Sequence, residues 1–373
     1  YDKAGPTQIR KALHLAGRYL SRATGAKGRF DYVYRADVND VPDAYNIVRH
    51  AGTVYSMFQL YRLNEDPELG DAASRAARYL IARVRPPCVE RRPGACVVAE
   101  GKTKLGANAL SILALVEGYR ATGKTRYLET AQKLARWIVA TTAENGRFQV
   151  HTQYYPGGKV KPFRSRYYPG EAIFSLARLY GVRPDKKWIE TAEKAAFYLI
   201  HVRDANLPLK RLDHDHWLLY GLNELHLHRE RRTFRAHSRR LTAAIIGSQN
   251  TSPAVADWLG SYSRPPRSTR TAIRSEGLCA GYSLERHSGR AQRARKLLKA
   301  IRRGIDFQLS TQIRAPQAMF LPDPPRALGG FRGDLTGHDI RIDYVQHNIS
   351  ALIQCLRILE ETSPSFVPET QGD

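Results

Sequence analysis

A repeat limits how this chain can fold more than any other feature of its sequence. About every 50 residues, a helical stretch with one basic face is followed by a turn or short extended segment and then by a second, more apolar helical stretch. The first stretches carry Arg and Lys on one face and apolar residues at helical spacing on the other, as outer helices do. They are predicted over residues 8–23, 71–84, 126–142, 186–202, 233–248 and 291–309.

The second stretches are rich in Ala, Gly, Leu and Ile on nearly all sides. This composition is typical of helices surrounded by other helices. They are predicted over residues 45–63, 105–122, 170–180, 215–228, 275–287 and 343–360.

Six outer and six inner helices in strict alternation resemble the (α/α)6 toroid, a ring of six helical hairpins around a central funnel. The predicted fold class is therefore all-α, with short β segments in the mouth loops and a single domain over residues 1–373. Proteins of this architecture include glycoside hydrolases, polysaccharide lyases and uronyl epimerase domains, together with terpene and lanthionine cyclases. The resemblance narrows the function without deciding it.

The charge of the chain is strongly positive. The 373 residues include 59 Lys and Arg against 35 Asp and Glu, a formal charge of +24, while 42% of them are hydrophobic, which excludes a disordered or collagen-like chain. No apolar stretch approaches the ~20 residues that cross a bilayer, so no membrane span is expected. Such a charge attracts polyanions. Nucleic acid is disfavoured as a partner, because the chain has no zinc-finger spacing and no RNA-recognition motif.

Carboxylates recur near the starts of the predicted inner helices. In a ring of hairpins these starts gather at one mouth of the funnel, so the carboxylates should converge there. Two of them would supply the acid and base, or the acid and nucleophile, of glycosidic cleavage. The alternative is that each one only caps its helix. The candidates are Glu171, Asp215, Glu276 and Asp343.

Histidine and tyrosine side chains offer a second chemistry at the same mouth. Tyr344, His347, His50 or His216 would exchange a proton beside a uronic carboxylate while an arginine stabilises the enolate, as in a lyase or C5-epimerase. No metal is expected, since a zinc site needs at least three suitably placed protein ligands and no such set is evident. No other cofactor is expected either.

Aromatic residues and arginines complete the predicted mouth. The aromatic rings would stack on sugars or simply close the core. The planar guanidinium groups favour an anionic ligand, because they bind carboxylate, sulfate or phosphate at two points. The predicted substrate-binding residues are Tyr45, Arg49, His50, Tyr167, Tyr168, His216, Trp217, Arg274, Phe331, Arg332 and Arg341.

The sequence thus predicts a carbohydrate-active enzyme acting on an acidic polysaccharide or glycan, with hydrolysis by paired carboxylates as the first choice. A lyase or C5-epimerase is the alternative, and a non-catalytic toroid that binds an anionic polymer or a protein partner is the rival from another class. A disulfide between Cys88 and Cys96 would close a short hairpin and favour a periplasmic or secreted protein. The oligomeric state is not predicted.

Overall fold

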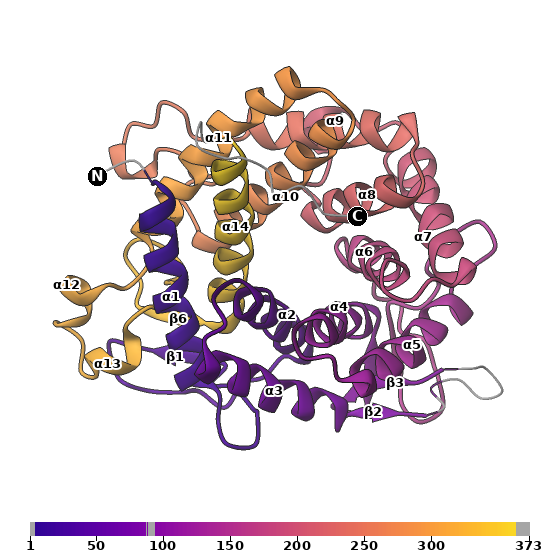
Figure 1. The fold of residues 1–373 in the computed structure, drawn as a ribbon, viewed down its shortest axis with the longest axis horizontal. Helices are drawn as coiled ribbons and strands as arrows, with labels where there is room; N and C mark the ends of the chain where they lie inside the picture. Colours follow the sequence, from indigo (N-terminus) through magenta and orange to yellow (C-terminus); the bar gives the residue numbers. More distant parts are fainter. Residues whose placement is uncertain (1–3, 87, 89–93, 363–373) are drawn as a thin grey trace, which may run out of the picture.

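A computed structural model describes residues 4–86, 88 and 94–362, and in these residues helical hairpins follow one another around a ring (Figure 1). The inner ring consists of α2 (Ile47–Asn64), α4 (Leu105–Thr122), α6 (Tyr168–Tyr180), α8 (His216–His228), α10 (Ser268–His287) and α14 (Ile342–Glu361). The outer ring consists of α1 (Pro6–Ala23), α3 (Pro67–Ile81), α5 (Thr125–Ala140), α7 (Lys186–Tyr198), α9 (Arg232–Gly247) and α11 (Ala291–Ser310). The (α/α)6 prediction is therefore confirmed.

The two rings differ in how much of each helix they bury. The outer helix α1 buries one face, which includes Ile9, Leu13 and Leu20, and leaves its basic face to solvent. The inner helix α4 is buried on all sides from Leu105 to Gly118. This is why periodicity identifies the outer helices and composition identifies the inner ones.

The ring closes through segments from opposite ends of the chain. Each inner helix contacts the next one, and α14 contacts both α2 and α1. Strand β1 (Val33–Arg35) pairs antiparallel with β6 (Asp339–Arg341), which places Val33 opposite Arg341. The loops before the first and last inner helices are therefore fixed to each other.

A second small sheet lies in the loops between α3 and α6. It joins β2 (Val84–Arg85), β3 (Cys96–Ala99), β4 (Lys102–Lys104) and β5 (Thr152–Tyr154) in that order. Cys88 and Cys96 form the predicted disulfide, with Cα atoms 5.8 Å apart. The remaining short elements are a π-helix at Leu199–Arg203, 3-10 turns at Leu209–Arg211 and Ala256–Trp258, and α12 (Ala315–Ala318) and α13 (Pro324–Ala327).

One predicted boundary was wrong by two turns. Helix α10 begins at Ser268, whereas the apolar pattern predicted a start at Ser275. The missed turns contain Thr269, Arg270 and Arg274, which are polar because they lie at the mouth. Within the described ranges, every helix is too short or too polar to cross a bilayer.

Candidate active site at the funnel mouth

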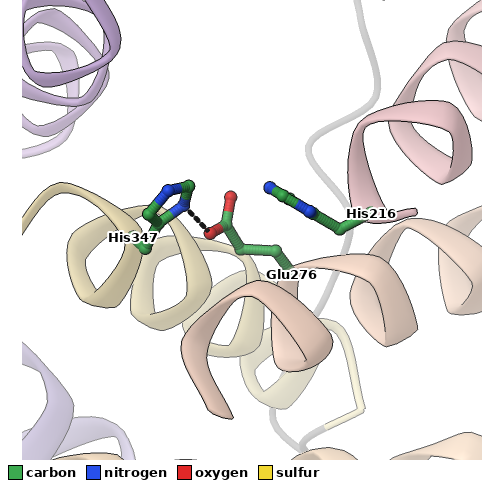
Figure 2. A group of neighbouring side chains, drawn as sticks. All are labelled: His216, Glu276 and His347. Carbon is green, nitrogen blue, oxygen red and sulfur yellow. Dashed lines mark hydrogen bonds and ion pairs between the residues drawn. The ribbon is translucent and has the colours of Figure 1, made fainter. Parts of the chain in front are cut away.

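Two histidines and a glutamate from three inner helices meet inside the mouth (Figure 2). His216 is the first residue of α8, Glu276 lies in the N-terminal half of α10, and His347 lies in the second turn of α14. One nitrogen or oxygen atom from each side chain lies within 4.8 Å of the others. The sequence offered the three as separate candidates, and the structure makes them one cluster.

Glu276 connects the cluster to the protein through both carboxylate oxygens. Oε1 lies 2.7 Å from Nδ1 of His347, and the hydroxyl of Tyr220 donates to Oε2 at 2.9 Å. The amide of Gln354 in turn donates to the Tyr220 hydroxyl. Burial raises the pKa of Glu276, and the charge and hydrogen bond of His347 and the bond from Tyr220 oppose that rise. This carboxylate therefore orients His347, as the acid of a triad orients its histidine.

His216 faces Glu276 from the other side and has no such support. It is buried, and neither ring nitrogen has a hydrogen-bond partner among the described residues. Burial, with smaller effects of His347 and Arg274, lowers the pKa of His216 well below its ordinary value. Trp217 lies 4.8 Å from the His216 ring and 6.1 Å from the His347 ring, centre to centre, and forms an apolar wall. A neutral imidazole without a partner suits a proton acceptor.

Glu171 is a second buried group without a counterion. It lies in the first turn of α6, and its Oε2 is buried without a partner among the described residues. Burial first, and then the negative charge of Asp215, raise the pKa of Glu171 to about 8. A β-carbon at position 106 would lie 2.4 Å from this oxygen, so Gly106 of α4 makes room for it. Glu171 is therefore protonated at neutral pH and able to donate a hydrogen bond.

Asp215 has partners on both oxygens. Oδ1 accepts the N–H of Leu218 at 3.0 Å as the N-cap of α8, and Oδ2 lies 3.4 Å from Arg203. Burial raises the pKa of Asp215 to about 6, although Arg203 opposes that rise. The capping role that the sequence left open for this residue is present.

Asp343 is held between two arginines. Nε of Arg49 lies 3.2 Å from Oδ2, and Arg341 donates to the same carboxylate from Nη2 at 2.9 Å. The Arg341 guanidinium also lies over the Tyr344 ring, 4.4 Å from its centre. Asp343 is therefore an ion-paired carboxylate at the mouth and not a free acid.

Arg274 is near enough to His216 to contribute to its lowered pKa, and it carries no carboxylate partner within the part of the chain described. Its Nε donates to Nδ1 of His214 at 2.9 Å, and its Nη1 donates to the carbonyl of Arg270. The exposed Tyr167 ring lies 5.9 Å from that of His216. Tyr168, half-buried, packs 6.1 Å from Phe163. Arg274 and these rings fit the predicted binding role, which stays a prediction.

Three predicted binding residues have structural roles instead. His50 is fully buried: Nδ1 bonds to the Tyr45 hydroxyl at 2.7 Å and Nε2 to the Ala76 carbonyl at 2.9 Å, and burial lowers its pKa to about 3. Phe331 is also fully buried, so its ring is not available to stack on a sugar. Arg332 donates to the carbonyls of Leu335 and Ser310 and fixes its own loop. We therefore exclude these residues from the site.

Two supporting residues were missed by the sequence reasoning. Tyr220 lies one helical turn after His216, so its position on the same face of α8 was readable from the spacing. Gln354 lies far from Tyr220 in the sequence, and nothing there links the two.

The cluster also has the donor atoms of a metal site. Two imidazoles and a carboxylate match the number and type of protein ligands in catalytic zinc sites. The donors of Glu276 are already bonded to His347 and Tyr220, however. The expectation that no metal is needed stays a prediction.

Comparisons with known proteins identify the fold. No family model matches the sequence, and no curated protein matches it either. Solved structures do match over nearly their whole length. The cellobiose 2-epimerase from Bacillus thermoamylovorans B4167 has 15% identity and a TM-score of 0.71 over 96% of this chain and 99% of that one.

A D-mannose isomerase matches with 15% identity and a TM-score of 0.68, over 94% of this chain and 97% of that one. An unsaturated glucuronyl hydrolase specific for heparin matches with 13% identity and a TM-score of 0.64, over 95% and 98%. The chain thus has the (α/α)6 toroid fold of these proteins. At such identities the likeness establishes the fold alone.

Proposed function

We propose that the protein is a carbohydrate-active enzyme that removes a proton from the carbon beside a carbonyl or carboxyl group of an acidic sugar. The observation that carries the proposal is the pairing of an unpartnered, neutral His216 with a His347 that Glu276 orients. The outcome of such a step is isomerisation when a proton is returned to the neighbouring carbon, epimerisation when it is returned to the opposite face of the same carbon, and elimination when a leaving group departs.

The distance between the imidazoles decides how they would act. Their ring centres are 5.4 Å apart, so the two rings reach neighbouring atoms of one ligand rather than opposite faces of one carbon. His216 takes the carbon-bound proton. His347, oriented by Glu276 through Nδ1, acts as the acid and gives a proton from Nε2 to the adjacent oxygen, and an enol forms. Arg274, which influences the pKa of His216, is our candidate for stabilising negative charge on that oxygen.

The acidic character of the substrate rests on the charges around the mouth. The chain carries a net +24, and Arg274 has no carboxylate partner among the described residues. Guanidinium groups bind carboxylates at two points, which favours a uronic acid over a neutral hexose. The D-mannose isomerase and the cellobiose 2-epimerase among the solved structures of this fold are compatible with the chemistry, although their own sugars are neutral.

Hydrolysis is the second candidate, because of Glu171. A carboxyl group with its pKa raised to about 8 is what a glycosidase uses as its general acid. Hydrolysis also needs a second carboxylate as base or nucleophile, and this part of the argument is weaker. Both oxygens of Asp215 are bonded, and Asp343 is held between two arginines.

One incubation separates the possibilities. The protein is mixed in deuterated buffer with free hexuronates, with oligomers of galacturonate, mannuronate and glucuronate, and with neutral hexoses and cello-oligosaccharides. We expect deuterium at one carbon of an acidic sugar, or an ultraviolet-absorbing unsaturated product. New reducing ends without either signal would favour hydrolysis. No change in any sugar that binds would favour the non-catalytic toroid.

The Cys88–Cys96 disulfide supports an oxidising location for this enzyme, either periplasmic or secreted. Its oxidation state in protein recovered from cells tests that part of the proposal.

A further inference from the structure

A cavity of about 460 Å³ lies beside the funnel mouth and takes no part in the chemistry above. It is bounded by the start of α2, the end of α3 and the strands β2 and β3. In Figure 1, α3, β2 and β3 lie on the outer side of the ring and α2 lies inside α3. Its volume falls in the range of small-molecule sites. Its lining includes Arg29, Arg83 and Arg85, the rings of Tyr45 and Tyr79, and Glu100.

Two tyrosine–arginine stacks shape the wall of this cavity. The Arg83 guanidinium lies 3.3 Å from the centre of the Tyr79 ring, and that of Arg29 lies 4.6 Å from the centre of Tyr45. The two tyrosine rings are 5.9 Å apart. The guanidinium groups are thereby held in fixed planes, which reduces the entropy that a ligand must remove from them.

The positive charge of the cavity is largely unpaired. Arg83 donates to the carbonyl of Tyr79 at 2.8 Å and Arg85 to that of Ala82 at 2.8 Å, and neither has a carboxylate partner among the described residues. Among the described residues, Arg29 pairs only with Asp43, whose side chain is 96% exposed. An exposed pair of that kind is weak and easily exchanged for a ligand. The described lining thus has one acid, Glu100, and three arginines.

A chain of contacts joins this cavity to the mouth. The Tyr45 ring lies 5.6 Å from that of Tyr32, and Arg49 donates to the Tyr32 hydroxyl. Arg49 then pairs with Asp343 on α14. These contacts connect the wall of the cavity to the Asp343 side of the mouth.

We propose that this cavity is a subsite for an anionic sugar residue, carboxylated or sulfated, of a glycan whose neighbouring unit occupies the funnel. The inference rests on the proposed function for the identity of the glycan, and it extends that function to a second sugar unit of the same glycan. The guanidinium groups that lie over the two tyrosine rings bind the acidic group of the sugar.

The test is binding, measured by calorimetry with an oligogalacturonate of four units, a sulfated oligosaccharide of similar length, and cellotetraose. The double variant Arg83→Gln/Arg85→Gln is compared with Arg183→Gln/Arg286→Gln, which removes the same charge from exposed positions at the far ends of α6 and α10. We expect the first variant to raise the dissociation constant for an acidic oligomer about tenfold or more, because charge-assisted bonds are lost. The second variant should change it less than twofold.

Equal affinities in both variants would overturn the subsite, as would equal binding of cellotetraose. Preference for the sulfated or the carboxylated oligomer identifies the acidic group. Tighter binding of a single-stranded oligonucleotide than of either sugar, lost in Arg83→Gln/Arg85→Gln, would assign the cavity to another ligand. Arg83→Lys, which keeps the charge without the fork, covers the case in which the double variant fails to fold.

The proposed chemistry and this subsite fail separately. A single hexuronate is too short to span both sites, so Arg83→Gln/Arg85→Gln should keep its kcat within twofold and raise KM only for oligomers. If His216 and His347 prove inert, oligomer binding still reports on the cavity. If the oligomer KM is unchanged while turnover proceeds, the subsite is wrong and the catalytic proposal stands.

Discussion

The inner helices bury carboxylates at both of their ends but treat them differently. At the end opposite the mouth, Glu117 of α4 is 1% exposed and accepts hydrogen bonds from Arg62, Arg120 and Arg178. Arg178 also makes two bonds to Glu224 of α8, at 2.6 and 2.9 Å. Burial alone would raise the pKa of Glu117, but the arginines outweigh it and the pKa is lowered.

At the mouth, Glu171 is equally buried and has no arginine partner among the described residues. Its pKa is raised to about 8, in the opposite direction from that of Glu117. Leaving a buried polar group unpaired costs free energy, so stability does not explain the arrangement. The ring thus pairs its buried carboxylates at one end, whereas at the mouth Oε2 of Glu171 and both ring nitrogens of His216 have no partner among the described residues, as is common at functional sites.

The largest effect should come from removing the oriented histidine. We expect His347→Asn to lower kcat by ~10³ while the melting temperature changes little, since acid–base catalysis contributes ~10² to 10⁴. Turnover of the sugar identified by deuterium exchange measures it. His226→Asn makes the same change at the far end of α8, where the ring bonds to Ser288, and should leave kcat intact. Similar losses in both variants would remove the distinction between the two ends.

The converse experiment removes an arginine from the ion-paired carboxylates at the end opposite the mouth. We expect Arg178→Gln to reduce the free energy of unfolding by about 3 kcal/mol or more, because it leaves Glu117 and Glu224 buried with fewer partners. Chemical denaturation measures the loss, and kcat of the folded fraction should stay within a few-fold. Arg183→Gln, an exposed neighbour after the same helix, should cost less than about 0.5 kcal/mol. If kcat fell while the free energy of unfolding stayed unchanged, this end of the ring would take part in catalysis.

The sequence was sufficient for the fold because the signals that define it are local. The two periodicities recur in every hairpin, and the predicted helix at 105–122 matches α4 at both ends. The first two turns of α10 were not predicted, because the polar side chains at the mouth interrupt the apolar pattern there.

The site was only partly predictable, because its geometry depends on contacts between distant segments. Glu276 and His347 are 71 residues apart, and only closure of the ring places them 2.7 Å from each other. Polar residue type did not separate roles: His50 and His216 are both buried at helix starts, yet one has two partners and the other has none among the described residues. Whether a buried polar group has a hydrogen-bond partner depends on tertiary packing, and the spacing of residues in the sequence does not show that packing.

Replacing the two mouth glutamates by glutamine should have intermediate effects. We expect Glu276→Gln to lower kcat by ~10², because an amide orients and supports His347 poorly as an acid. Glu171→Gln should lower it by ~10-fold or more if its proton reaches the substrate. Full activity in both variants would sink both assignments and return attention to Asp215 and Asp343.

The same Glu171 variant gives a pH signature. Its pKa rises from an ordinary 4.5 to about 8 in the folded protein. Between these values the folded state binds the extra proton, so the wild type loses stability as the pH rises, and the loss is complete above pH 8. Glu171→Gln lacks this loss. Its melting temperature relative to wild type should therefore increase from pH 5 to pH 8.5, and a constant difference would show that Glu171 is ionised like an ordinary carboxylate.

A smaller effect is expected when Arg274 becomes lysine. Lysine keeps the charge but loses the planar fork and the bond from Nε to His214, so KM for an acidic sugar should rise about tenfold with kcat nearly unchanged. Raising the salt concentration should weaken wild-type binding in the same direction, since exposed charges are screened within ~10 Å at 0.1 M. An unchanged KM would place the acidic group of the substrate elsewhere in the mouth.

The smallest effect is expected for metal removal, which tests the donor atoms of the cluster at the mouth. His216, Glu276 and His347 offer three donors within 4.8 Å of one another, yet the Glu276 oxygens already bond His347 and Tyr220. A metal bound by Oε1 of Glu276 and Nδ1 of His347 would replace the hydrogen bond between them, and the orientation of His347 would be lost with it. We therefore expect dialysis against EDTA to change kcat less than twofold, and Tyr220→Phe, which frees Oε2, to leave it equally insensitive to the chelator. A tenfold loss that Zn²⁺ or Mn²⁺ restores would show that the cluster is a metal centre, and that the unpaired nitrogens of His216 serve an ion rather than a proton.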